Sequence, residues 1–208
     1  MDDPKQSQPA SDQTDTVAKT QKLPRLSTDP ADQEKEAAFE EGQKRILQMI
    51  DSNVPLAEIL TSLVLLIEAQ TPEMLCSVLL LSADGNHIVH GAAPNLPEQY
   101  VNAVNGAPIG PKHGSCGTAM YRGEPVVVTD IFSDPLWDDY RDLAVGTGLR
   151  ACWSTPIMSR RGKVLGSFAM YYRQPQVPTG DEAKLTKVAT NLAAQAIEHH
   201  AQQRASEK

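Results

Sequence analysis

The stretch from Ile109 to Tyr172 constrains the fold of this 208-residue chain more than any other part of it. It begins with a loop that contains several glycines and continues into a short β-branched run, Val126–Asp130. A polar and aromatic insertion follows over residues 132–149, and two apolar runs then form a hairpin over residues 151–172. Short strands joined by turn residues are typical of an antiparallel sheet, so we expect such a sheet with one inserted segment.

Apolar residues at helical spacing flank this region on both sides. Two helices precede it, the first ending near Asp51 and the second beginning at Pro55. Between them and the central stretch, Asp84-Gly85 is a strong hairpin signal that separates two further strands. A last helix follows, with an apolar stripe made up of Leu185, Val188, Ala189, Leu192 and Ala196. This order predicts an α+β fold in which a five- or six-stranded, mainly antiparallel sheet carries the helices on one face and the insertion on the other.

Composition divides the chain into three parts. Residues 1–33 are poor in large apolar side chains and rich in Ser, Thr, Gln, Asp and Pro, so they cannot bury enough surface to offset chain entropy. We therefore expect a disordered N-terminal tail over residues 1–33 and a single domain over 34–200, which includes the flanking helices. Residues 201–208 are expected to form a C-terminal tail.

Charge and cysteine usage exclude several classes of protein. The formal net charge is −7 and Lys and Arg form no cluster, which argues against nucleic-acid binding. The longest apolar runs fall far short of the ~20 residues that span a bilayer, and the acidic start is no secretory signal. Three cysteines without CxxC spacing, Cys76, Cys116 and Cys152, suit free thiols in a reducing compartment. We expect a cytoplasmic protein that does not associate with membranes.

Five segments of the chain carry a family resemblance. They are Ile-Gly-Pro-Lys-His-Gly-Ser-Cys-Gly-Thr-Ala (109–119), Glu-Pro-Val-Val-Val-Thr-Asp-Ile (124–131), Asp-Pro-Leu-Trp-Asp-Asp-Tyr (134–140), Gly-Leu-Arg-Ala-Cys-Trp-Ser-Thr-Pro-Ile (148–157) and Gly-Lys-Val-Leu-Gly-Ser-Phe-Ala-Met-Tyr-Tyr (162–172). In order and spacing, these segments resemble a GAF domain, the small-molecule sensor module of bacterial signalling proteins. The resemblance covers residues 45–200.

This resemblance implies a function. A GAF domain of this kind is a non-enzymatic sensor, without catalytic residues, that binds a small molecule and signals through its flanking helices to a partner or an output module. Neither the ligand nor any cofactor can be named from the sequence. The resemblance also implies a homodimer through the first and last helices, in which Leu185, Leu192 and Ala196 take part.

The resemblance further places a ligand pocket between the insertion and the loop 113–118. The predicted ligand-binding residues are Cys116, Thr118, Trp137, Tyr140, Arg150, Trp153 and Thr155. The two tryptophans would form apolar walls, and the hydroxyl-bearing residues would hold polar groups of the ligand. Arg150 would orient an anionic group, or would instead pair with Asp139 or Asp142. Along the strand, Trp153 and Thr155 share one face, whereas Cys152 and Ser154 lie on the other.

Two other functions stay open. Cys116 lies in a glycine loop comparable to that of the free methionine-(R)-sulfoxide reductases, another branch of GAF proteins. That branch also needs a cysteine in the insertion, in a His-Ile-Ala-Cys-Asp context, and residues 132–149 contain none. His113 is a candidate haem or tetrapyrrole ligand. The alternatives are a small packed residue for Cys116 and a surface loop residue for His113. The histidine spacing predicts no metal site, and the patterns of cyclic-nucleotide and bilin-binding GAF domains are absent.

Overall fold

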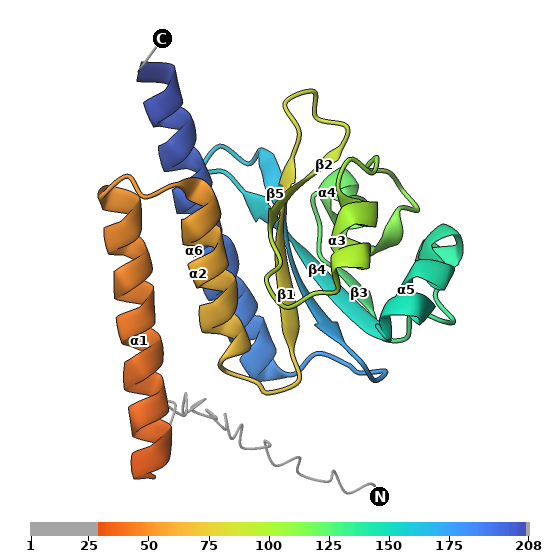
Figure 1. Ribbon diagram of the computed structural model, residues 1–208, viewed down its shortest axis with the longest axis horizontal. Coiled ribbons are helices and arrows are strands. Elements are labelled where there is room, and N and C mark those ends of the chain that lie inside the picture. The colour runs from red at the N-terminus through yellow and green to blue at the C-terminus, as the bar shows by residue number, and fades with distance from the viewer. Residues whose placement is uncertain (1–28, 207–208) are drawn as a thin grey trace, which may run out of the picture.

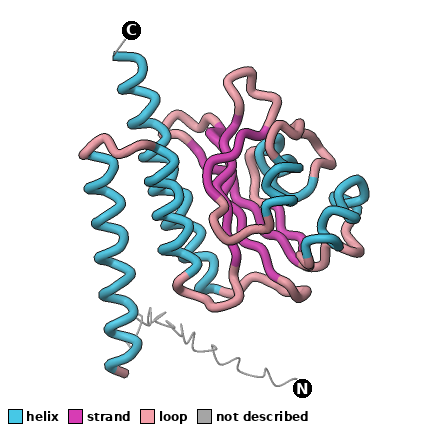
Figure 2. The backbone as a smooth tube through the Cα atoms, viewed as in Figure 1, coloured by secondary structure: helices cyan, strands magenta, loops and turns pink. Residues whose placement is uncertain are grey.

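The computed structural model describes residues 29–206. A five-stranded antiparallel sheet lies between two groups of helices, as Figures 1 and 2 show. The helices are α1 (Pro30–Asp51), α2 (Leu56–Glu68), α3 (Glu98–Val104), α4 (Gly114–Arg122), the 3-10 helix η1 (Pro135–Tyr140), α5 (Arg141–Thr147) and α6 (Gly180–Ser206). The strands are β1 (Leu75–Leu81), β2 (Ile88–Ala92), β3 (Val126–Val128), β4 (Ala151–Met158) and β5 (Val164–Tyr172).

The strand order is β2-β1-β5-β4-β3, and every neighbouring pair is antiparallel. The predicted α+β fold is thus confirmed. The hairpin between β1 and β2 turns at Gly85, whose φ of 76° is a left-handed conformation that glycine adopts at little cost. In the centre of the sheet, Gly166 has no room for a side chain, because an added Cβ would lie 2.1 Å from the carbonyl oxygen of Leu79.

One face of the sheet, called the helix face here, is covered by α2 and α6. Helix α1 packs outside them, as the left half of Figure 1 shows. Leu60 and Leu63 of α2 are fully buried against Val78 and Phe168 of the sheet. This layer is closely packed and apolar, as the stripes of the predicted helices require.

The opposite face, called the pocket face here, carries the shorter helices α3, α4, η1 and α5. Helix α4 packs directly on β4 and β5, and η1 packs on α4. The insertion therefore lies on the face opposite the long helices, as the sequence predicted. This second layer brings the loop before α4 and the insertion over the same strands.

Two helices extend beyond the limits of the predicted domain over residues 34–200. Asp29 caps α1 through a hydrogen bond from the Ala31 amide, so the helix already begins at Pro30, inside the predicted tail over residues 1–33. Residues 1–28 of that tail lie outside the described residues. At the other end, α6 runs through Ser206 and takes in most of the predicted tail over 201–208.

The apolar stripe predicted for a dimer is covered within the same chain. Leu192 is 4% exposed and Ala196 is 1% exposed, and both belong to the core under the helix face. Leu185 is partly buried against the same core. These residues cannot be the main contacts of a homodimer, and the homodimer itself stays a prediction. Among the described helices, none is long and apolar enough to cross a membrane.

Candidate functional site

The first turn of α4 anchors the site on the pocket face. The helix begins at Gly114, so Cys116 lies inside its first turn. Gly114 has a φ of 59°, a left-handed conformation in which a side chain is strained. The His113 amide donates to the Thr118 hydroxyl at 3.1 Å, which closes the loop onto the helix. Thr118 is fully buried and holds the loop in place.

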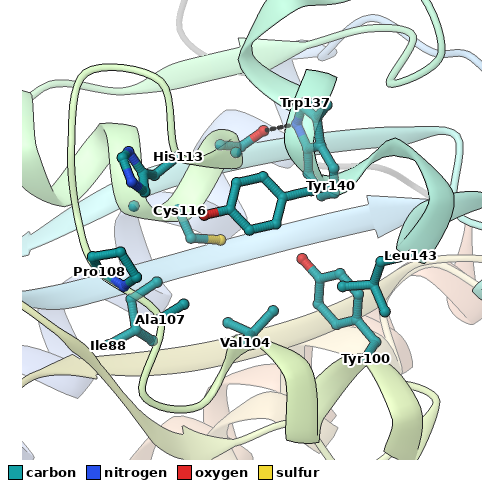
Figure 3. A pocket seen from close by; sticks show the side chains of 13 residues that line it. Ile88, Tyr100, Val104, Ala107, Pro108, His113, Cys116, Trp137, Tyr140 and Leu143 are labelled. Carbon is teal, nitrogen blue, oxygen red and sulfur yellow. Dashed lines mark hydrogen bonds between the residues drawn. The ribbon is translucent and has the colours of Figure 1, made fainter.

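A cavity lies beside this turn and is shown in Figure 3. Its lining comes from β2, α3, the loop before α4, α4 itself, η1 and α5: Ile88, Tyr100, Val104, Ala107, Pro108, His113, Gly114, Ser115, Cys116, Gly117, Trp137, Tyr140 and Leu143. The empty space is about 350 Å³ with the solvent at its mouth included, but only about 20 Å³ admits the centre of a water molecule. In Figure 3, the Tyr140 ring extends across the cavity above Cys116.

Aromatic side chains form the inner wall. Tyr100 stacks on Trp137 with ring centroids 6.5 Å apart and meets Tyr171 edge-on at 5.5 Å. The Trp137 indole N–H donates to the Ser115 hydroxyl at 3.0 Å, and that hydroxyl donates to the Cys152 carbonyl oxygen at 3.1 Å. These two hydrogen bonds fix η1 and α4 to strand β4; the one made by Trp137 is the dashed line in Figure 3.

A cluster of thiols and hydroxyls lies beneath the cavity. We call it the polar network; its members are Ser77, Cys116, Cys152, Ser154, Ser167 and Tyr171, and all are buried. The Tyr171 hydroxyl lies 3.0 Å from the Ser77 hydroxyl and 3.3 Å from the Cys116 sulfur. The Ser154 and Ser167 hydroxyls have no hydrogen-bond partner in the described chain, and both contribute to lowering the pKa of Cys116.

The polar network separates the acidities of its two thiols. Hydrogen bonds, of which the one with Cys152 is the largest, lower the pKa of Cys116 to about 7 in spite of its burial. Burial raises the pKa of Cys152, and so does its hydrogen bond with Cys116. The same burial raises the pKa of Tyr171. Cys116 is therefore the thiol that ionises first, and Cys152 stays protonated as a donor to it.

The structure brings three of the predicted site residues together. Cys116, Trp137 and Tyr140 line the cavity, and Thr118 lies just outside its lining. Trp137 is 2% exposed and forms one wall of this cavity. The segments expected to meet, the insertion and the loop before α4, do meet over the sheet.

Trp153 and Thr155, which the sequence predicted as ligand-binding residues, do not line this cavity. Trp153 belongs to the core of the helix face and packs on Tyr172 with ring centroids 4.7 Å apart. Thr155 shares that face by strand alternation. Both faces of β4 are buried, so the sequence pattern could not say which one turns toward the cavity. The other face, with Cys152 and Ser154, is the one beneath it.

Arg150 does not line the cavity either. Its guanidinium makes hydrogen bonds to both carboxylate oxygens of Asp130, at 3.0 and 3.1 Å, and stacks on the Phe132 ring at 4.2 Å. The sequence offered an ion pair of Arg150 as the alternative, with Asp139 or Asp142 as the partner. Arg150 does form an ion pair, but its partner is Asp130. This arrangement ties the end of β3 to the start of β4, and it leaves the cavity without the predicted cation.

Several residues of the site were missed by sequence reasoning. Tyr100 and Val104 come from the helix α3, which was not among the predicted site segments. Tyr171 was assigned to the last hairpin without a role. Strand alternation gives the signal for Tyr171, because it shares a face with Ser167 and, through the adjacent strand, with Cys152.

The family profile of the GAF domain matches residues 53–198. The chain therefore belongs to the GAF domain family. A curated relative, the methyl sulfide methyltransferase-associated sensor of Methanosarcina acetivorans, is 39% identical over 157 residues. The match covers 76% of this chain but spans only 16% of that sensor's length.

Solved structures share the fold at lower identity. The GAF domain of a phosphoenolpyruvate-protein phosphotransferase from Coxiella burnetii matches with a TM-score of 0.63 at 18% identity, covering 81% of this chain and 98% of that one. The free methionine-R-sulfoxide reductase from Neisseria meningitidis, in complex with its substrate, matches with a TM-score of 0.61 at 15% identity, covering 86% and 97%. At these identities the likeness concerns the fold alone.

Proposed function

We propose that this chain is a sensory GAF module that binds a small, uncharged molecule in the cavity between α3, α4 and η1. The observation that carries the proposal is the lining of that cavity. It combines three aromatic rings with aliphatic side chains and the polar atoms of the first turn of α4. Mainly apolar walls with a few fixed polar groups are typical of small-molecule sites.

The lining also indicates the chemical class of the ligand. Among the described residues that line the cavity, none is Lys, Arg, Asp or Glu. A full charge buried there would lack a partner and would be costly. The first turn of α4 offers backbone N–H groups, which suit a hydrogen-bond acceptor on the ligand. We therefore expect a neutral, partly apolar molecule with an accepting oxygen or nitrogen, and not the anion that Arg150 had suggested.

The cavity must open to admit such a ligand, because so little of its volume is free. Tyr140 is the side chain placed to move. It lies across the cavity and is partly exposed. Among the described aromatic residues, its only ring partner is His113, with ring centroids 6.3 Å apart. Rotation of this ring would enlarge the cavity without disturbing the sheet.

Strand β5 offers a path from the cavity to the long helices. Tyr171 points to the pocket face, and its neighbour Tyr172 points to the helix face, where its hydroxyl donates to the Glu182 carboxylate. Glu182 also accepts the Thr179 amide at 2.7 Å and so caps the start of α6. A shift of β5 on ligand binding would be passed to α6, and from there to a partner or an output module.

Sulfoxide reduction is the second candidate function, since Cys116 lines the cavity and the pKa of its thiol is lowered to about 7. Free methionine sulfoxide, however, is a zwitterion, and the cavity lining has no charged pair to hold its two charges. We therefore favour the sensor. Turnover of free methionine sulfoxide coupled to NADPH and thioredoxin would reverse this ranking.

The test of the sensor uses a matched pair of substitutions. Ala107→Phe fills the cavity, whereas Ala103→Phe adds the same ring on an exposed position of α3 outside it. Native mass spectrometry of the purified protein should show a bound small molecule in the parent and in Ala103→Phe, and lose it in Ala107→Phe. Equal loss or equal retention in the two variants contradicts the proposed site. A Soret band in the absorbance spectrum would instead identify a haem occupant.

A further inference from the structure

The three cysteines are divided between the two faces of the sheet, one on the helix face and two on the pocket face. All three are free and buried. Cys76 points into the apolar core of the helix face, where burial raises the pKa of its thiol. Cys116 and Cys152 both lie on the pocket face, one on the first turn of α4 and the other on β4 directly beneath it. Tyr171, whose hydroxyl lies 3.3 Å from the Cys116 sulfur, is the cross-strand partner of Cys152, so both thiols lie beside the same tyrosine.

We propose that Cys116 and Cys152 form a redox-active dithiol, which a small hydroperoxide converts into a disulfide that joins α4 to β4. Neither the family match nor the proposed ligand implies this pair. The proposal does not depend on ligand binding, because it rests on the contacts within the polar network.

The contacts around Cys116 suit a thiolate better than a thiol. The Tyr171 hydroxyl lies 3.3 Å from its sulfur. The hydroxyls of Ser154 and Ser167 are buried without a hydrogen-bond partner, and both favour the ionised form of Cys116. A buried hydroxyl without an acceptor costs about 1–3 kcal/mol, so these groups gain when the sulfur is ionised and accepts from them. The sulfur also lies in the first turn of α4, where the helix dipole favours a negative charge.

The two cysteines differ in access. Cys116 is 5% exposed and forms part of the cavity lining, so a small oxidant in the cavity can reach its sulfur. Cys152 is fully buried beneath it and is absent from the lining. The hydrogen bond from the Ser115 hydroxyl to the Cys152 carbonyl oxygen holds this part of α4 close to β4. Cys116 is therefore the attacking residue and Cys152 the resolving one.

The chemistry balances in two steps. In the first, the Cys116 thiolate attacks one oxygen of the hydroperoxide, the O–O bond breaks, and the leaving alkoxide or hydroxide takes up a proton. The product is a sulfenic acid on Cys116 and an alcohol or water. In the second step, the Cys152 sulfur attacks the Cys116 sulfur, the S–O bond breaks, and water leaves with the Cys152 proton. Two thiols are oxidised and one hydroperoxide is reduced.

The experiment treats the whole chain with hydrogen peroxide and then maps the cysteines by mass spectrometry. The parent should lose the mass of two hydrogen atoms, lose two of its three alkylatable thiols, and yield a peptide pair linked through Cys116 and Cys152. Dithiothreitol should reverse all three changes. A linked pair that contains Cys76, or three thiols that all remain alkylatable after denaturation, overturns the proposal.

Single substitutions give the controls. Cys76→Ser removes the cysteine of the other face and should react like the parent. Cys152→Ser should stop at the sulfenic acid, which gains one oxygen atom and is trapped by dimedone on Cys116. Cys116→Ser should form neither product. A dimedone adduct on Cys152, or a disulfide that forms equally well in Cys116→Ser, contradicts the assigned roles. If one variant folds poorly, the cysteine map of the parent protein still tests the disulfide.

Discussion

The two faces of the central sheet are built from the same strands and have opposite chemistry. On β4 and β5, the residues Trp153, Phe168, Met170 and Tyr172 point to the helix face and meet the apolar sides of α2 and α6. Their immediate neighbours Cys152, Ser154, Ser167 and Tyr171 point to the pocket face and form the polar network. The difference assigns stability to one face and chemistry to the other.

Burial alone does not separate these faces, since both are closed to solvent. What separates them is the kind of group that is buried. Apolar side chains on the helix face gain from leaving water, whereas each hydroxyl on the pocket face must find a partner or carries a cost. Buried hydroxyls that are kept in spite of this cost indicate a role in contacting a ligand or a reactive sulfur.

The largest effect is expected from adjacent substitutions on β5, which compare the two faces directly. Phe168→Ala removes a ring that is 1% exposed in the core of the helix face, and should lower the free energy of unfolding by about 3–5 kcal/mol. Ser167→Ala, one residue earlier, removes a hydroxyl without a partner nitrogen or oxygen and should change stability by less than about 1 kcal/mol. Urea unfolding measures both values. Equal losses would show that the two faces contribute alike.

A second pair of neighbours tests the chemistry. Tyr171→Phe leaves the Ser77 hydroxyl without its partner and should cost about 1–2 kcal/mol. It also removes a donor to the Cys116 sulfur, so the pKa of Cys116 should rise above its value of about 7. The thiolate fraction at neutral pH then falls about tenfold for each unit of the rise. The rate of alkylation of Cys116 as a function of pH measures this change.

Tyr172→Phe is the matched control for that experiment. It loses the hydrogen bond to Glu182 on the helix face, and it leaves the contacts of Cys116 unchanged. The variant should lose stability to a similar degree, but its alkylation profile should overlay that of the parent. A parallel shift of both profiles would mean that the thiol responds to general loosening of β5 and not to the Tyr171 hydroxyl.

The sequence predicted the sheet, the long helices and the insertion well, because each rests on a local signal. Asp84-Gly85 marks a turn, and the stripes of α2 and α6 mark buried helix faces. The sequence also grouped Trp153 with Thr155 and Cys152 with Ser154 correctly. It assigned the first group to the pocket because aromatic residues commonly form ligand walls, whereas the structure places the second group beneath the cavity. Only the packing of α6 on β4 decides between them.

The polar network was beyond reach of the sequence for a related reason. Its members come from β1, α4, β4 and β5, and Ser77 and Tyr171 are 94 residues apart. A single serine in an apolar strand carries no signal of its own. The positions of Cys116 and Cys152 relative to each other likewise depend on how α4 packs on β4, which no local pattern shows.

The smallest effect is expected at Arg150, which belongs to neither face. Arg150→Lys keeps the positive charge but loses the bidentate contact with Asp130 and the stacking on Phe132. The hydrogen bond with Arg150 holds the pKa of the Asp130 carboxyl below its usual value. A carboxyl with a lowered pKa stabilises the fold above its unfolded pKa, and this contribution is lost as the pH falls through the folded pKa. The stability difference between parent and variant should thus be small at neutral pH and vanish in acid.

Ligand retention in Arg150→Lys, measured as for the Ala107→Phe variant, should be unchanged, because Arg150 does not line the cavity. Loss of the ligand in Arg150→Lys with an intact fold would instead return Arg150 to the site and show that the ligand carries a negative charge.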